Sequence, residues 1–211
     1  MNHPINSHLF WGSNSPLATL SSTALIILAS SRFAFALVAS GALLWVYVLS
    51  ALVYALGQPI MPQLGRRAIL LFTASLMGGI FMILLGILNP LLLLGCGFFL
   101  FLIPPSCMGS RFYETGPSDD AAEFCSQALS EALMICIIIL ALALIREPLG
   151  MRTLSFPGGS EGIVELFESR EGEFIPIRIL SVSAGGLLLL GYGTALFRYF
   201  REQSSGIREE Y

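Results

Sequence analysis

The hydrophobic residues of this chain fall into six blocks separated by more polar segments. Their lengths run short, long, long and then short, long, long again: 17–30, 33–56, 68–88, 91–103, 121–145 and 177–197. A helix needs about 20 apolar residues to cross a bilayer, so the long blocks predict spanning helices and the short blocks predict partial ones. The pattern predicts an all-α integral membrane protein of six apolar helices, with the first and fourth half-length.

The doubled order of lengths indicates two three-helix repeats within a single membrane domain, residues 1–211. We place the first repeat at about 15–88 and the second at about 89–201, and interpret them as inverted copies. Paired short or proline-interrupted segments at matching positions of two halves point to a site at the membrane midplane. We therefore expect function near 19–23 and 104–108.

Two boundaries follow from breaker residues. Pro104 and Pro105 are expected to end the fourth helix, because proline cannot continue a helix interior. The segment 147–176 is expected to be an extramembrane loop. Within it, residues 161–168 alternate apolar and acidic side chains in a pattern that predicts a short amphipathic helix on the membrane or on a partner.

Composition agrees with a membrane protein and narrows the partners. Hydrophobic residues make up 55% of the chain and charged residues 12%, with a mean hydropathy of +0.78. The net charge is −3 without a basic run, which argues against a nucleic-acid partner and leaves the lipid bilayer as the expected surroundings. The N-terminal 16 residues contain no Arg or Lys, so the first block is kept as a helix rather than a cleaved signal peptide.

Few ionisable residues lie inside the apolar blocks, and Glu131 is the clearest. It lies about ten residues into the fifth block, with Gln127 one helical turn earlier. Both are candidates for an ion pathway; the alternative is that the helix begins later and Glu131 lies among the headgroups. Arg146 and Glu147 close the block and are expected to be interfacial. No catalytic triad, phosphate loop or nucleotide fold is recognisable, so no catalytic residues are expected.

The cysteines do not form a metal-binding motif. Cys96, Cys107, Cys125 and Cys136 lack the spacing of a zinc knuckle or a redox pair. Three of them are expected to pack as small apolar residues. Cys107 follows Pro104, Pro105 and Ser106 at the end of a half-length helix, where a functional role competes with a packing role.

At the end of the fifth block, the run IREPLGMRTLSF resembles a known signature. It is similar to the R-E-x-x-G-x-G-x-L-F motif in the small membrane subunits of the Rnf and Nqr redox pumps, of the RnfA, RnfE, NqrD and NqrE type. Arg146, Glu147, Gly150 and Leu154 match, while Arg152 replaces the second glycine. Met108 and Gly109 resemble the start of a second family stretch, and Asn14-Ser15-Pro16 resembles an Asn-Pro before the first helix.

The resemblance implies a six-helix subunit that pairs with an inverted sister subunit. The complex would couple electron transfer to translocation of Na⁺ or H⁺. In that family each of the two subunits contributes two cysteines, one per half-helix, to an iron–sulfur cluster. This chain has Ala24 or Leu25 at the first position, and a gapless alignment puts Pro105 at the second. Either a 2Fe–2S cluster shared with the sister subunit takes Cys107 as a single metal ligand, or the cluster is absent; we favour absence.

Two other functions fit the same pattern. One is a stand-alone secondary transporter, because inverted repeats with broken helices occur in many carriers. The other is a structural membrane subunit without a cofactor. For the proposed subunit we expect the inner (cytoplasmic) membrane, with both termini in the cytoplasm. Arginines number six on the side of the termini and five on the other side, so the positive-inside rule gives little direction.

Overall fold

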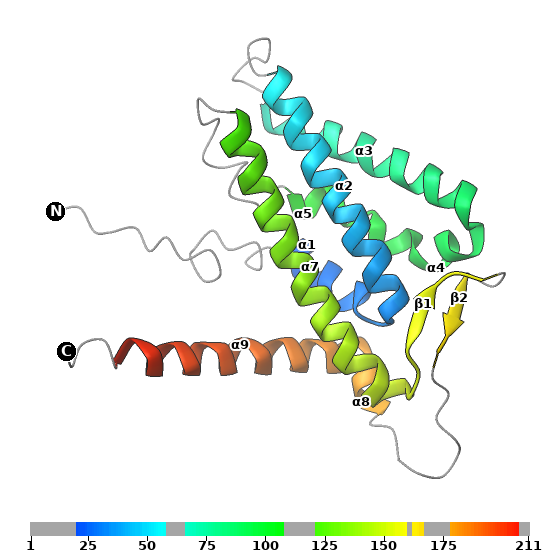
Figure 1. The fold of residues 1–211 in the computed structure, drawn as a ribbon, viewed down its shortest axis with the longest axis vertical. Helices are drawn as coiled ribbons and strands as arrows, with labels where there is room; N and C mark the ends of the chain where they lie inside the picture. Colours follow the sequence, from blue (N-terminus) through cyan, green and yellow to red (C-terminus); the bar gives the residue numbers. More distant parts are fainter. Residues whose placement is uncertain (1–19, 58–65, 108–120, 160–161, 167–177, 207–211) are drawn as a thin grey trace.

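The structure is a computed structural model that describes residues 20–57, 66–107, 121–159, 162–166 and 178–206. The described chain is mostly helical, with one small hairpin (Figure 1). The elements are α1 (Leu20–Ala29), α2 (Phe33–Gly57), α3 (Arg66–Leu88), α4 (Pro90–Leu100), α5 (Ile103–Cys107), α7 (Ala121–Met151), β1 (Ser155–Pro157), β2 (Ile163–Glu165), α8 (Arg178–Ser181) and α9 (Ser183–Gly206).

Three helices are long and apolar enough to cross a membrane. They are Phe33–Gly57, Ala68–Leu88 and Cys125–Met151, which correspond to the second, third and fifth sequence blocks. Their length follows from uninterrupted apolar sequence, because 21 residues or more at about 1.5 Å per residue exceed the ~30 Å hydrocarbon core. The prediction of an integral membrane protein with spanning helices at these blocks is thus supported.

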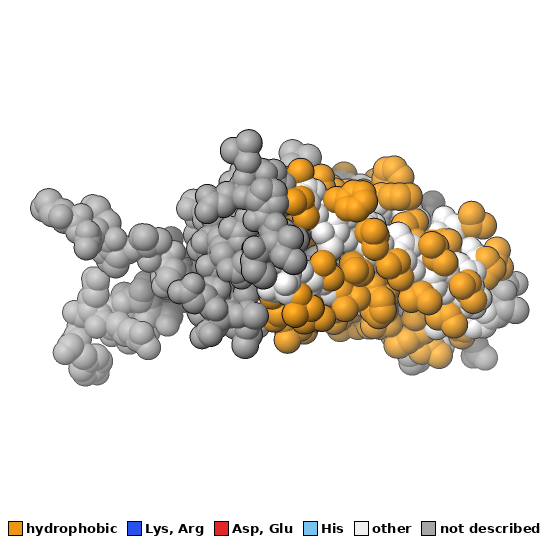
Figure 2. All heavy atoms as spheres, turned by 90° about the horizontal axis from the view of Figure 1, so that it is seen from above, with side chains coloured by type: hydrophobic (Ala, Val, Ile, Leu, Met, Phe, Trp, Pro, Cys, Tyr) orange, Lys and Arg blue, Asp and Glu red, His pale blue; other side chains and the backbone are white. Residues whose placement is uncertain are grey.

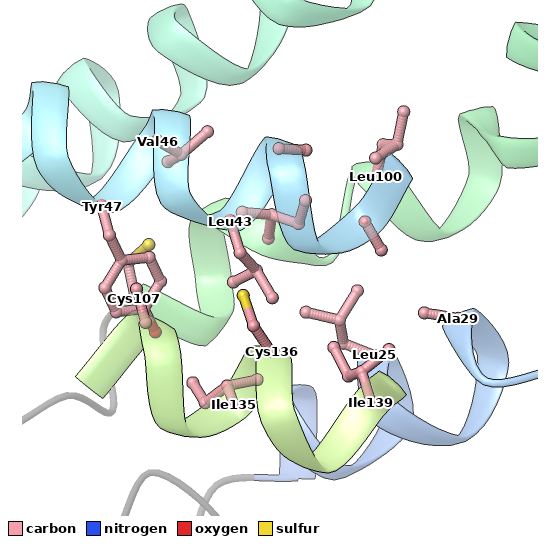
Figure 3. Close-up of a cluster of buried hydrophobic side chains, with 14 of the residues drawn as sticks. Leu25, Ala29, Leu43, Val46, Tyr47, Leu100, Cys107, Ile135, Cys136 and Ile139 are labelled. Carbon is pink, nitrogen blue, oxygen red and sulfur yellow. The ribbon is translucent and has the colours of Figure 1, made fainter. Parts of the chain in front are cut away.

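The core lies between α2 and α7, which run side by side through the centre of the molecule (Figure 1). The short helices α1 and α5 pack against each other and against this central pair, while α3 and α4 cover another side of α2. Figure 3 shows the apolar side chains that meet there from α1, α2 and α7, including Leu25, Leu43 and Ile139, which are fully buried. This arrangement brings the half-length segments to the middle of the bundle.

The outer surface of the bundle is apolar. Helix α3 exposes Phe72, Ile83 and Ile87, and α4 exposes Leu94 and Phe98, each with at least 65% of its surface accessible. In Figure 2 the described part of the molecule presents hydrophobic and uncharged side chains. A contiguous apolar surface of this kind fits contact with lipid or with other membrane helices.

The fourth block departs from its prediction at the prolines. Helix α4 ends at Leu100, and a turn at Phe101 and Leu102 leads into α5, so Pro104 and Pro105 lie at the start of a helix instead of ending one. The first turn of a helix accepts proline because its N–H groups have no partner within the helix. Asn89 begins α4 by accepting a hydrogen bond from the Leu92 N–H at 3.1 Å.

The sixth block is not one continuous helix. Helix α8 stops at Ser181 and α9 restarts at Ser183, and the apolar part of α9 is the short segment Ser183–Leu196. Beyond its first turns α9 extends away from the other helices (Figure 1). The prediction of a spanning helix over 177–197 is therefore not met within the described residues.

The segment 147–176 was expected to be loop with an amphipathic helix, and both parts are corrected. Helix α7 continues to Met151, and Ser155–Pro157 pairs antiparallel with Ile163–Glu165, so that Phe156 lies opposite Val164. Between these strands, Gly159 and Gly162 have φ values of +75° and +84° that favour glycine. Residues 163–165 of the alternating apolar and acidic segment therefore form strand β2 by pairing with β1. Alternation of apolar and acidic residues also fits a strand, because side chains of a strand alternate between its two faces.

Candidate functional site

Arg146 is buried near the end of α7, with 1% of its surface exposed. Its guanidinium donates hydrogen bonds to the carbonyl oxygens of Ile27 at 2.7 Å, Leu180 at 2.6 Å and Ser181 at 3.0 Å, and to the Ser30 hydroxyl at 3.2 Å. These acceptors lie at the C-terminal ends of α1 and α8, where carbonyls have no partner within the helix. One side chain therefore joins α7 to two other helix ends, a contact that the sequence did not predict.

Glu147 is fully buried and binds the opposite kind of helix end. Its Oε2 accepts a hydrogen bond from the Phe33 N–H at 2.6 Å, at the start of α2, and its Oε1 accepts one from the Thr153 hydroxyl at 3.4 Å. The following amide of α2, the Ala34 N–H, donates a hydrogen bond to the Ser155 hydroxyl at 3.3 Å. Glu147 is thus a helix-capping residue.

The two charges match the dipoles of the helix ends that they bind. A helix carries about half a negative charge at its C-terminus and half a positive charge at its N-terminus. Arg146 meets the C-terminal carbonyls of α1, and Glu147 meets the N-terminal amides of α2, on either side of the turn at 30–32. The pair therefore fixes the half-length helix α1 relative to both central helices.

Both glycine positions of the sequence signature have a geometric requirement. A Cβ at Gly150 would lie 3.0 Å from the Ser181 backbone nitrogen, so a side chain there would push α8 away. Arg152, at the position of the second family glycine, has φ = 61° and is the one described non-glycine residue with a positive φ. Its N–H bonds to the Pro148 carbonyl at 3.1 Å and ends α7, as a left-handed residue commonly does.

Replacing Arg152 by glycine tests this backbone requirement. A non-glycine residue in the left-handed region costs about 1 kcal/mol, so Arg152→Gly is expected to raise the stability of the purified chain by up to that amount. The measurement is the free energy of unfolding in detergent. Arg152→Ala serves as the control, because it removes the same side chain without relieving the backbone; equal effects of the two variants would contradict the conformational explanation.

A second group of polar residues lies between α2, α5 and α7. Glu131 is 4% exposed, in the seventh position of the span Cys125–Met151, which places it about 9 Å inside that span. Cys107, at the end of α5, is fully buried, forms a hydrogen bond with the Tyr47 side chain and interacts electrostatically with Glu131. Figure 3 shows the Tyr47 ring beside Cys107.

The end of α5 is held by further polar contacts. The Tyr47 hydroxyl donates to the Ser106 carbonyl at 3.3 Å, and the Ser106 hydroxyl donates to the Ile103 carbonyl at 2.7 Å. From α1, the Ser21 hydroxyl donates to the Pro105 carbonyl at 3.3 Å. The half-length segments α1 and α5 therefore meet at the two regions, 19–23 and 104–108, where the sequence predicts function.

The remaining sequence candidates lie elsewhere. Gln127 is exposed one turn before Glu131 and does not join the interior cluster. Met108 and Gly109 fall outside the described residues. Sequence reasoning did not single out Tyr47 or Ser155, because a tyrosine in an apolar block and a serine in a loop give no signal without their neighbours in space.

The residues at the half-length segments do not fit an iron–sulfur cluster of the family kind. Within the described part of the chain no group of three or more His, Cys, Asp or Glu side chains is placed to hold a metal ion. Leu25, at one expected cysteine position, is buried in the apolar core, and Cys96 and Cys136 lie away from Cys107 on other turns. Cys107 is the one described thiol beside the contact of α1 with α5.

Comparisons of the chain with protein-family models, with curated protein sequences and with solved structures give no significant match. The sequence signature and the geometry of its residues are therefore the basis for a functional assignment.

Proposed function

We propose that this chain is an integral membrane subunit of an Rnf/Nqr-like electron-transport complex that couples electron transfer to ion translocation. The observation that carries the proposal is the geometry of the signature at the end of α7. Arg146 and Glu147 bind opposite helix ends, Gly150 permits close approach of α8, and Arg152, where the signature has its second glycine, adopts a backbone conformation that favours glycine. A chance match to the motif has no reason to satisfy each of these requirements.

The arrangement of short helices supports the same proposal. The half-length α1 and the broken α4 and α5 meet beside the central pair α2 and α7, and each is followed in sequence by one member of that pair. Two inverted three-helix repeats would place α1 and α4–α5, and likewise α2 and α7, in equivalent positions. In this scheme α3 and α9 are the third helices of the repeats, with α9 lying against an inverted sister subunit in the complex.

Purification of the chain from its native membrane tests the proposal. We expect it to co-isolate with flavin-bearing and iron–sulfur subunits, and its gene to lie beside theirs. A solitary homodimer that transports a solute when reconstituted would contradict the proposal and favour a stand-alone transporter.

The same preparation tests whether the subunit binds iron. Because Cys107 is its one thiol at the half-helix contact, we expect Cys107→Ala to leave the iron content and the electron paramagnetic resonance spectrum of the reduced complex unchanged. Cys125→Ala is the matched control, since Cys125 lies on α7 away from that contact. Loss of a cluster signal in Cys107→Ala alone would show that this subunit supplies a ligand after all.

We further propose that the chain lies in the cytoplasmic membrane with both termini in the cytoplasm. Of the arginines on the opposite side, Arg146 is buried in contact with carbonyls and Arg32 pairs with Glu165 at 3.5 Å. If these two arginines are left out of the count of loop arginines, more of them lie on the side of the termini than on the other side. A C-terminal reporter that is active only outside the cytoplasm is expected to be silent; an active one would reverse the orientation.

A further inference from the structure

The polar cluster at the end of α5 joins three ionisable side chains from three helices. Glu131 comes from α7, Cys107 from α5 and Tyr47 from α2, and all three are at least 96% buried. Cys107 forms a hydrogen bond with Tyr47 and lies near enough to Glu131 for an electrostatic interaction. Apolar segments rarely contain such groups unless the groups have a role there.

The neighbouring elements add few other ionisable groups. Helix α1 contains none, and α2 adds Tyr54, two turns beyond Tyr47. On α7 itself the nearest are Cys125 and Cys136, before and after Glu131. A carboxyl group at this depth is more stable with a proton than as a bare charge, because a charge loses its hydration there.

Polar side chains lead along α7 toward Glu131. Ser126, Gln127 and Ser130 precede Glu131 within about a turn and a half, and all three are exposed. Polar side chains on successive turns can carry hydrogen-bonded water from the helix end toward the buried acid. On the inner side, the Tyr47 hydroxyl continues the polar contacts to the Ser106 carbonyl at 3.3 Å.

The donor set suits a proton better than a metal cation. Hard cations such as Ca²⁺ and Mg²⁺ are held by about six oxygen ligands, and Na⁺ likewise takes oxygens. Here the nearby oxygens are the Glu131 carboxyl group, the Ser106 carbonyl, and the Tyr47 and Ser106 hydroxyls, which each already donate to a carbonyl; the third ionisable member is a sulfur, which is a soft ligand.

We propose that Glu131, Cys107 and Tyr47 form a proton-binding site inside the membrane-spanning region, with Glu131 as the group that gains and loses the proton. Uptake converts the Glu131 carboxylate to the carboxylic acid with a proton from water on the α7 side, and release returns it; no electron moves in this step. The inference deepens the proposed function, because it names the translocated ion as H⁺, although the site itself exists in the isolated chain.

Infrared difference spectroscopy of the purified full-length chain in lipid nanodiscs tests the site. A pH titration is expected to show one carbonyl stretch of a buried carboxylic acid that disappears in Glu131→Gln. The band should shift in frequency in Cys107→Ala, because the neighbouring thiol is gone. Glu165→Gln, in the exposed strand β2, is the matched control and should keep the band unchanged.

The outcomes separate this site from its alternatives. Absence of the band in the natural chain, or its persistence in Glu131→Gln, would overturn the proposal. Loss of the band at constant pH when Na⁺ replaces choline would identify a sodium site and overturn it as well. Glu131→Asp keeps the acid, so a shifted band in that variant supports the site even if Glu131→Gln folds poorly. Failure of the chain to co-isolate with redox subunits would count against the proposed function and leave this result unaffected.

Discussion

Arg146→Ala is expected to destabilise the chain by about 3–5 kcal/mol, the largest effect of any single substitution proposed for it. The change removes the guanidinium donors from the carbonyls of Leu180 and Ser181, which are half-buried, and leaves the Ile27 carbonyl with the Ser30 hydroxyl alone. It also leaves the buried carboxylate of Glu147 without the nearby positive charge. The measurement is thermal unfolding in detergent, where we expect the midpoint to fall by about 10 °C.

Two further variants make the Arg146 experiment specific. Arg146→Lys keeps the charge but loses the planar fork that reaches α1 and α8 together, so an intermediate loss is expected. Arg32→Ala is the matched control, because Arg32 and Glu165 are 34% and 43% exposed and such ion pairs contribute at most about 1 kcal/mol. If Arg146→Ala were no less stable than Arg32→Ala, the proposed joining of helix ends would be wrong.

Glu147→Ala is expected to give the second largest loss, about 2–3 kcal/mol. The Phe33 N–H at the start of α2 loses its acceptor, the Glu147 Oε2 at 2.6 Å. Because the Glu147 side chain is fully buried, water does not readily take the place of this acceptor. Glu147→Gln keeps an acceptor oxygen and removes only the charge that favours a helix N-terminus, so a smaller loss of about 1–2 kcal/mol is expected.

Hydrogen exchange locates the effect of the Glu147 variants. Faster exchange should be confined to the first turn of α2 and the adjoining turn at 30–32, since these amides depend on Glu147 and Ser155. Glu165→Gln is the control with the same chemical change at an exposed position. Uniformly faster exchange throughout α2 would argue for general unfolding and against a local cap.

For the signature residues, the sequence gives the residue types and their spacing, and the tertiary structure gives the contacts that they make. The resemblance at Arg146 to Leu154 rested on residue types and spacing, and gave no reason for them. The structure supplies the reasons: a charge for each helix end, a glycine where two backbones approach, and a left-handed residue where α7 stops. Arg152 is unusual because it holds a backbone conformation that favours glycine.

By itself the sequence predicted four spanning helices, and the structure has helices long and apolar enough to span at three of these blocks; the sequence also predicted that α1 and α4 are short. Length and hydropathy suffice for this, because backbone hydrogen bonds in lipid must be made within each helix. It also predicted function near 19–23 and 104–108, since hydroxyl and proline residues interrupt apolar blocks there.

Only the tertiary structure decided where the sixth block breaks, that residues 163–165 pair as a strand, and that Arg146 and Glu147 are buried. The break after Ser181 accompanies hydrogen bonds from Arg146 to the last carbonyls of α8, thirty-odd residues away in sequence. The burial of Glu131 likewise depends on the packing of α2 against α7. These outcomes depend on contacts between residues that are distant in sequence. The sequence alone does not predict them, because the hydrophobic pattern of a segment indicates only how long that segment is and which of its faces is apolar.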